Sequence, residues 1–330
     1  MRHFLSLMIF ALTVAPPLSG LLFHHELTDS ERKAATVCWQ QEVNTSFNEL
    51  IVSFNALRPE RGSYHIRICI KTDEWSDWFD YADWAKNEQR SFSSTMQKPQ
   101  ASCSQDTLEV KDASNAVAFR VEVQALNGSD LSQFYALFAS CADTKNLQFQ
   151  AFDKQVQSVR LDIAGVSQMA LNDVNAMRLC SPCSTTSVVS FLTKKSLDPL
   201  VFAQTVYDSG HDIYGNWMLN IAESFSLLGP SYRAWVERLD GFETIYKYLV
   251  QGIPSVVSVR GTLDTALKPY NSGHLIAVIG YNATDDSIIC MDPCYPTNGE
   301  TIVAYPRDAF LQVWKTRGQF AYLFQLAWRL

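Results

Sequence analysis

The stretch LCSPCSTTSVVSFL (residues 179–192) decides between the folds open to this chain, because it places two thiols at the start of an apolar, helix-like segment. Cys180 and Cys183 are three residues apart and bracket a Ser-Pro pair. Ser181 suits an N-cap and Pro182 suits the first helical position, so the sequence predicts a helix that begins directly after Cys180. The positive end of such a helix favours a thiolate at that cysteine.

Three kinds of chemistry are compatible with these thiols. Cys180 and Cys183 could join Cys290 and Cys294 in a zinc site of four thiolates, although the gap between the two pairs is very long. A Cys-x-x-Cys thiol oxidoreductase places its pair after a strand of a βαβ unit, whereas no clear strand precedes Cys180. The third possibility is a nucleophilic cysteine, which needs a nearby base.

The base is sought among six histidines, of which only His211 and His274 lie in the second half of the chain. The run HLIAVIGY begins at His274, a turn follows, and the run SIICMD ends at Asp292. In an antiparallel hairpin centred on that turn, His274 and Asp292 lie opposite each other, with Cβ atoms about 5 Å apart. The pattern therefore favours Cys180 as nucleophile, His274 as base and Asp292 as the residue that orients the imidazole.

The first half of the chain shows alternation typical of β-strands. The runs at 47–57, 63–72 and 116–126 alternate apolar and polar residues and are separated by turn residues, which predicts an antiparallel β-sandwich. The run LSQFYALFAS (131–140) has apolar residues at helical spacing and predicts a short helix. Residues 142–160 are expected to connect this half to the next.

The second half mixes both element types, so we expect an α+β protein with a sandwich over residues 21–150 and a second domain over 155–330. Helices are expected at 183–194, 217–228 and 240–251, and strands at 255–261, 274–281 and 287–292.

A cluster of five aromatic residues, WSDWFDYADW (75–84), lies in the first half. Such a cluster could stack on sugar rings and let the sandwich contact a glycan. Aromatic side chains supply core area more often than ligand platforms, so we expect these residues to pack within the protein.

The N-terminus has the pattern of an export signal. Arg2 precedes the apolar run Phe4–Val14, which is too short to span a bilayer, and small residues follow near a predicted cleavage site. We therefore expect residues 1–20 to be a signal peptide, no membrane span in the mature protein, and a secreted or periplasmic, cell-envelope location. Export makes disulfides among the eight cysteines permissible.

Composition narrows the range of partners. The chain is 47% apolar and 18% charged, with a net charge of −7, which argues against nucleic acid or an anionic membrane as a main partner. The chain also lacks a GxxxxGK[ST] motif, which argues against a fused ATP-driven exporter.

Several segments together carry a resemblance to a known family. They are VSQMALNDVNAMRLCSPCSTTSVV, YGNW, LVQGIPSVVSV, GHLIAVIGY, MDPCYP and VAYPRDAFLQVW, in this order along the chain. The chain resembles the bacteriocin-processing-like cysteine peptidases of papain-like fold, and among them exported members with an N-terminal β-sandwich. The resemblance implies a papain-like peptidase domain over residues 155–330 that needs no metal or organic cofactor.

The resemblance implies roles for individual residues. Cys180, His274 and Asp292 match the nucleophile, the general base and the orienting residue. Gln168 matches the donor to the oxyanion, and Asn175 is a rival for that role. Such a donor stabilises the negative oxygen that develops during acyl transfer.

Further positions follow from the same resemblance. Trp217, Asn216 and Gly273 are expected to contact substrate. Cys183 and Cys294 stand where other residues are usual, close to the catalytic groups, and we expect them to form a disulfide that joins the nucleophile helix to the Asp292 loop.

The expected activity is hydrolysis of amide bonds in a peptide or protein, such as a cell-wall peptide, through a covalent acyl-enzyme. Two alternatives stay open at this point. One is an inactive, peptidase-like binding protein whose sandwich recognises a glycan or a protein. The other is the Cys-x-x-Cys thiol oxidoreductase.

Overall fold

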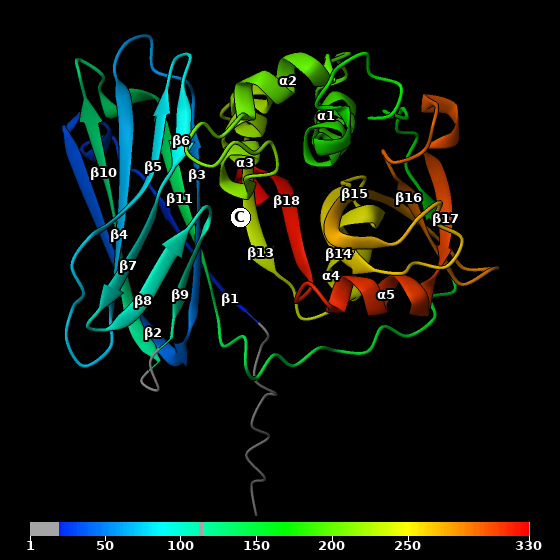
Figure 1. The fold of residues 1–330 in the computed structure, drawn as a ribbon, viewed down its shortest axis with the longest axis horizontal. Helices are drawn as coiled ribbons and strands as arrows, with labels where there is room; N and C mark the ends of the chain where they lie inside the picture. The colour runs from blue at the N-terminus through cyan, green and yellow to red at the C-terminus, as the bar shows by residue number, and fades with distance from the viewer. Residues whose placement is uncertain (1–19, 112–114, 330) are drawn as a thin grey trace, which may run out of the picture.

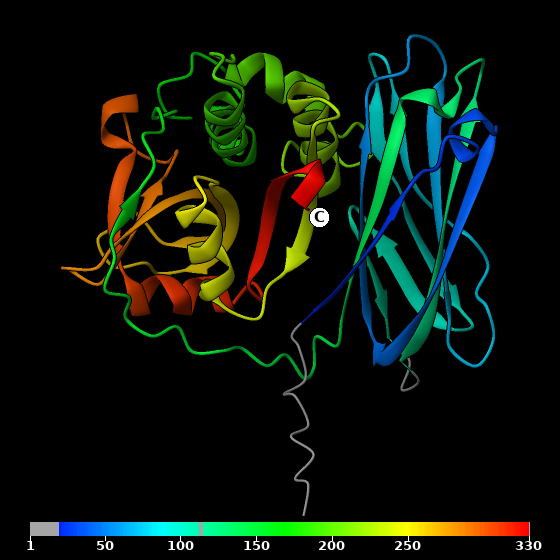
Figure 2. The same cartoon turned by 180° about the vertical axis from the view of Figure 1, so that it is seen from behind.

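The computed structural model describes residues 20–111 and 115–329. Two domains lie side by side, an N-terminal β-sandwich and a C-terminal domain of mixed helices and strands, as both views show (Figures 1 and 2). This is the α+β architecture predicted from the sequence. Apart from Gly20, the predicted signal peptide lies outside the described residues.

The sandwich consists of two antiparallel sheets. One has the strand order β1-β11-β3-β9-β8-β7 and the other the order β2-β10-β4-β5-β6. The strands of the first sheet are β1 (Leu21–Glu26), β3 (Glu49–Ala56), β7 (Ser93–Gln97), β8 (Gln100–Ser104), β9 (Thr107–Val110) and β11 (Phe134–Ala142). Those of the second sheet are β2 (Thr36–Phe47), β4 (Ser63–Lys71), β5 (Phe79–Ala85), β6 (Gln89–Ser91) and β10 (Ala116–Leu126).

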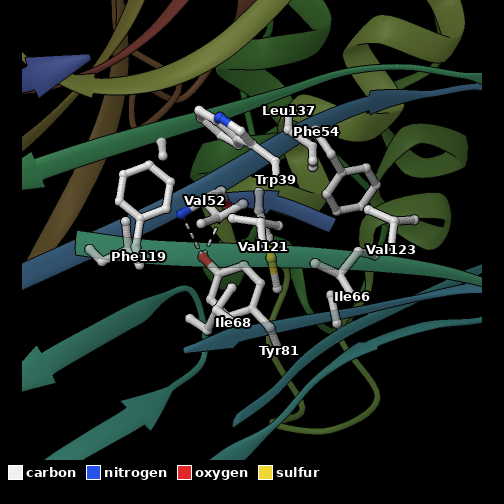
Figure 3. Close-up of a cluster of buried hydrophobic side chains, with 14 of the residues drawn as sticks. Trp39, Val52, Phe54, Ile66, Ile68, Tyr81, Phe119, Val121, Val123 and Leu137 are labelled. Carbon is white, nitrogen blue, oxygen red and sulfur yellow. Dashed lines mark hydrogen bonds between the residues drawn. The ribbon is translucent and has the colours of Figure 1, made fainter. Parts of the chain in front are cut away.

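Three of the five aromatic residues at 75–84 pack within the protein, as predicted, whereas Trp75 and Trp78 are half-buried. Phe79, Tyr81 and Trp84 are buried in the sandwich core. The Tyr81 side chain reaches from one sheet to the other, where its hydroxyl accepts the Val52 N–H (3.0 Å) (Figure 3). The hydroxyl also donates to the carbonyl of Asp106 (2.6 Å).

The prediction of a helix over residues 131–140 is wrong. A single turn of 3-10 helix, Leu131–Gln133, leads directly into strand β11. β11 lies between β1 and β3 and is buried along nearly its whole length. A strand covered on both faces carries a continuous apolar run, which periodicity alone does not distinguish from a buried helix.

The C-terminal domain is built on one antiparallel sheet with the order β13-β18-β14-β15-β16-β17, and β12 pairs with β15. Its strands are β12 (Val159–Arg160), β13 (Tyr232–Arg238), β14 (Ser255–Gly261), β15 (Tyr270–Asn282), β16 (Ser287–Met291), β17 (Ile302–Pro306) and β18 (Phe320–Leu326). Its helices are α1 (Cys180–Thr193), α2 (Pro199–Val206), α3 (Trp217–Leu228), α4 (Phe242–Val250) and α5 (Arg307–Lys315). None of the helices in the described part of the chain has the length and apolar character required to cross a membrane.

Strand β3 joins the two domains because it is buried on both faces. Its alternate residues Leu50, Val52, Phe54 and Ala56 belong to the sandwich core. On the opposite face, Ser53 accepts the Val236 N–H (3.2 Å), and Asn55 exchanges two hydrogen bonds with the backbone of Ala234 (2.6 and 3.1 Å). Both partners lie in β13, an edge strand, so polar side chains of the sandwich satisfy the open edge of the second sheet.

The connector between the domains follows the surface of the second domain to β12 (Figure 2). Backbone and side-chain groups hold it there: Gln150 N–H donates to the carbonyl of Asp240 (2.7 Å), and Gln155 N–H donates to the Tyr281 hydroxyl (3.2 Å). The two domains are therefore joined through β3 and through an ordered connector.

Candidate active site

Cys180 is the first residue of α1, so this helix begins two residues earlier than predicted. Leu179, not Ser181, is the N-cap residue. The Ser181 hydroxyl instead donates to Asn220 Oδ1 (2.9 Å) and lies 3.0 Å from the Tyr322 hydroxyl, which ties the first turn of α1 to α3 and β18. The sulfur of Cys180 therefore lies at the positive end of a 14-residue helix.

His274 lies near the start of β15 and bridges Cys180 and Asp292. Its Nε2 is 2.8 Å from Asp292 Oδ1, and the ring also hydrogen-bonds the sulfur of Cys180. Because Nε2 faces the carboxylate, Nδ1 is the nitrogen left for the sulfur. Backbone N–H groups of Leu275 and Ser181 also contribute to the lower pKa of the Cys180 thiol. The structure thus brings the three predicted residues together in one hydrogen-bonded line.

Asp292 directly follows β16 and meets His274 diagonally, not directly opposite as predicted. The prediction centred the hairpin too early in the sequence, whereas β15 and β16 pair from Asn282 and Ser287 outward. Continued to its end, this register places residue 276 opposite Asp292. Residue 276 shares a face with His274, since side chains alternate along a strand, and a diagonal neighbour is within reach of an imidazole. At the turn the predicted register is wrong by three residues, but a β-bulge between Val278 and Gly280 takes one residue back. The error at Asp292 is therefore two residues, and His274 stays on the predicted face.

Two tyrosines that the sequence analysis missed complete the environment of Asp292. The hydroxyls of Tyr270 and Tyr305 donate to Asp292 Oδ2 (2.6 and 2.7 Å), and the Cys294 N–H donates to Oδ1 (3.0 Å). The Tyr270 ring also stacks on the His274 ring, with centroids 4.2 Å apart. Tyr270 precedes His274 by four residues on the same strand, so period-two spacing was a usable signal; Tyr305 offered none.

The electrostatics of the group favour a thiolate–imidazolium pair. Burial by itself lowers the pKa of His274, but the charge and hydrogen bond of Asp292, with a contribution from Cys180, raise that pKa to about 10. Burial raises the pKa of Cys180, and the hydrogen bond and charge of His274 more than offset it, so the thiol pKa is below its usual value. Burial likewise opposes the charge of Asp292, yet His274 and Tyr270 hold its pKa below the usual range.

Gln168 lies between the Asp292 loop and the approach to α1. Its backbone N–H donates to the carbonyl of Pro293 (2.9 Å), and its side-chain Nε2 donates to the carbonyl of Ala176 (3.0 Å). Its Oε1 is buried and has no hydrogen-bond partner among the described residues. The rival Asn175 instead accepts from Arg178 (3.3 Å) and is half-buried.

A pocket of about 590 Å³ opens beside His274, between the two domains. Trp217 and Gly273, both predicted to contact substrate, line this pocket. The third predicted contact, Asn216, is fully buried at the N-cap of α3, where its amide donates to Asp208 (2.9 Å). The structure therefore places Asn216 in the support of α3, away from the pocket.

The predicted disulfide between Cys183 and Cys294 is not present. All eight cysteines lie within the described residues, and each is a free thiol. On α1, Cys183 faces a small apolar cluster with Leu179 and Ala203, the latter from α2. Cys294 belongs to a separate cluster in the core of the second domain. The helix turns Cys183 toward α2, so the two thiols do not face each other.

The four cysteines considered as zinc ligands, Cys180, Cys183, Cys290 and Cys294, do not form a metal site in the described residues. Within residues 20–111 and 115–329, no group of three or more His, Cys, Asp or Glu side chains lies close enough to hold a metal ion.

Comparison with known proteins agrees with this geometry. A family model described as the Peptidase_C39 like family matches residues 160–322, and a model of the Peptidase C39 N-terminal domain matches residues 24–135. A search of curated proteins gives no match. The two matched regions fall on the mixed domain and on the sandwich, in the order expected from the resemblance. The chain therefore belongs to the C39-like family of papain-fold cysteine peptidases and carries the N-terminal domain of that family.

Proposed function

We propose that this protein is an exported cysteine peptidase that hydrolyses amide bonds of a peptide or protein through a covalent acyl-enzyme. The observation that carries the proposal is the hydrogen-bonded line from Cys180 through His274 to Asp292, next to the pocket between the domains. Family membership supports the peptidase part of the proposal.

In the first half-reaction, the Cys180 thiolate attacks the carbonyl carbon of the scissile amide and forms a C–S bond. Electrons move to the carbonyl oxygen, and the tetrahedral intermediate then collapses with cleavage of the C–N bond. The His274 imidazolium gives its Nδ1 proton to the departing amine. Asp292 keeps the ring oriented and stabilises its positive charge.

The oxyanion is stabilised by two donors. One is the backbone N–H of Cys180, which has no intrahelical partner at the first position of α1. The other is the second amide hydrogen of Gln168 Nε2, whose first hydrogen is held by Ala176. Removal of one such donor typically lowers kcat by about 10²–10³-fold.

In the second half-reaction, neutral His274 takes a proton from water, and the resulting hydroxide attacks the thioester. The C–S bond breaks, the acid leaves, and the thiolate–imidazolium pair is restored. Each cycle therefore consumes one water and one amide bond and needs no redox partner.

Export rests on the apolar run near the N-terminus. It is tested by mass spectrometry of the protein recovered from the culture medium or envelope of its host. A mature N-terminus close to residue 21 supports export, and an intact Met1 in a protein retained inside the cell contradicts it.

The chemistry is tested by alkylation with iodoacetamide between pH 5 and 9, with the modified sites assigned by mass spectrometry. Because its pKa is lowered, we expect Cys180 to react rapidly at pH 6, and we expect this reaction to collapse in His274→Ala. Cys38 provides the matched control. It is an exposed residue, and partial desolvation of its thiol and the charge of Glu122 raise its pKa. Equal labelling of Cys180 in both proteins, without peptide cleavage, supports an inactive binding protein instead.

A further inference from the structure

The pocket beside His274 is walled by both domains. On the side of the second domain its lining includes Trp217, Ser258 and Arg317, and on the side of the sandwich it includes the turn between β8 and β9, residues 104–107. The pocket is therefore a space that neither domain forms alone.

Arg317 lies in this pocket without an ion-pair partner among the described residues. Its Nε donates to Ser258 Oγ (3.2 Å), and its guanidinium carbon lies 5.6 Å from the ring centre of Trp217. Burial lowers the pKa of Arg317, and the nearby charges of Arg238 and Arg260 lower it further. A guanidinium stays protonated in such surroundings, so its terminal nitrogens can donate to an anion.

The buried carboxylates of the pocket wall are engaged elsewhere. Glu49 pairs through both oxygens with Arg238 (Nη2–Oε2 2.7 Å). Asp106 is buried and accepts the backbone N–H of Trp217 (2.8 Å) at the start of α3. Glu109, which also lines the pocket, is exposed to solvent. The charges of Asp106 and Glu49 act on Arg317 from a distance, but none of the ion pairs among the described residues includes this half-buried guanidinium.

The distance from the nucleophile to this cation can be followed across the sheet. Cys180 interacts with His274, the next residue of β15 is Leu275, and Leu275 is paired with Ser258 in the neighbouring strand. Ser258 in turn accepts a hydrogen bond from Arg317. Neighbouring strands are about 4.8 Å apart, and an extended peptide advances about 3.4 Å per residue. The guanidinium is therefore in reach of a group one or two residues from the scissile bond.

We propose that Arg317 binds a carboxylate of the substrate in this pocket and makes the enzyme selective for acidic peptides. The inference rests on the proposed peptidase function. The carboxylate is either the side chain of an acidic residue or the terminal carboxylate of the peptide, and both sources present the same bidentate acceptor to the guanidinium.

The test uses the full chain and fluorogenic peptides in which one position at a time, on either side of the scissile bond, is Glu or Gln. A second series compares peptides with a free C-terminal acid and with a C-terminal amide. For wild type we expect kcat/KM to be about 10–100-fold higher for the charged member at one position or at the C-terminus. The series in which the preference occurs identifies the source of the carboxylate.

Three variants of Arg317 test whether this residue is the source of the preference for a carboxylate. In Arg317→Gln the preference should fall to within about threefold, in Arg317→Glu it should reverse toward Lys-containing peptides, and in Arg317→Lys it should survive in part because the charge remains. Arg260→Gln is the matched control, because Arg260 is an exposed arginine at the end of the neighbouring strand β14. Thermal unfolding checks that each variant is folded, and Arg260→Gln should cleave both the charged and the neutral peptides as wild type does.

Failure of the inference differs from failure of the proposed function. A wild-type enzyme that cleaves peptides without preferring a carboxylate at any position overturns the carboxylate site and leaves the peptidase standing, as does an unaltered preference in Arg317→Gln. Absence of both peptide cleavage and selective Cys180 alkylation overturns the peptidase, and the carboxylate site with it.

Discussion

Each domain of this protein has a histidine hydrogen-bonded to an aspartate across antiparallel strands. In the second domain, His274 Nε2 lies 2.8 Å from Asp292; in the sandwich, His65 Nδ1 lies 2.6 Å from Asp83, its direct partner in the pairing of β4 and β5. The two pairs differ in what the other ring nitrogen meets. For His274 it is the thiol of Cys180, whereas for His65 it is a second carboxylate, Asp80 (3.0 Å).

The surroundings also differ. Asp292 is fully buried and receives both tyrosine hydroxyls, whereas Asp83 is half-buried and receives Arg90 (2.8 Å). A carboxylate raises the pKa of its histidine in both places. A histidine bound to an aspartate thus occurs in both domains. The nucleophile beside the second ring nitrogen distinguishes the candidate catalytic pair.

Removal of each histidine in turn tests whether His274 takes part in catalysis and His65 does not. We expect His274→Ala to lower kcat/KM for a peptide by about 10²–10⁴-fold, the range for loss of a general acid–base group. His65→Ala should keep kcat/KM within about twofold and reduce stability by about 1 kcal/mol through lost hydrogen bonds. Peptide hydrolysis at pH 7 and urea unfolding of both variants measure this. Similar losses of activity in the two would remove the distinction between the pairs.

The sequence predicted the candidate pair in the second domain because its determinants are local. The two residues lie on one hairpin, and His274 and Asp292 share a face because a β-bulge between Val278 and Gly280 reduces the register error from three residues to two. The helix after Cys180 is predictable for a similar reason, because its apolar residues and Pro182 act within two turns.

Other features depend on contacts between distant segments and could not be predicted. The hydroxyl of Tyr305 reaches Asp292 only because β16 and β17 pair, and nothing in the neighbouring sequence indicates this. β11 was taken for a helix because its two buried faces hide the alternation of a strand. The disulfide predicted for Cys183 does not form, because the positions of thiols in the sequence do not determine which way a helix turns them.

The tyrosine donors distinguish Asp292 from Asp83, which receives a hydrogen bond from Arg90 instead. A hydrogen bond to a charged group contributes about 1.5–3 kcal/mol, so Tyr270→Phe and Tyr305→Phe should each destabilise the fold by up to that amount. Loss of either donor leaves the negative charge of Asp292 less stabilised. We expect kcat/KM to fall by about tenfold, which corresponds to roughly 1.4 kcal/mol of activation free energy. Tyr64→Phe is the control, because the buried Tyr64 hydroxyl has no hydrogen-bond partner among the described residues. If Tyr64→Phe alters activity as much as the other two, the effect is not specific to Asp292.

The smallest expected difference is the dependence of stability on pH that His65 contributes. Hydrogen bonding to Asp83 raises the pKa of His65 above its usual value, although burial opposes the shift. Protonation therefore favours the folded state. The contribution is fully present below the unfolded pKa of about 6.5 and is lost as the pH rises through the higher folded value.

This contribution should be under about 1 kcal/mol, since the pair lies near the surface and salt screens it. Urea unfolding of wild type and His65→Gln at several values between pH 5.5 and 9 measures it, and the difference between the two proteins should shrink as the pH is raised. The corresponding window for His274 extends to a pKa of about 10, because Asp292 is buried and its charge is unscreened. A wild-type advantage over His65→Gln that stays constant up to pH 9 would mean that His65 stabilises the sandwich as a neutral ring, and the two pairs would then differ in charge as well as in partner.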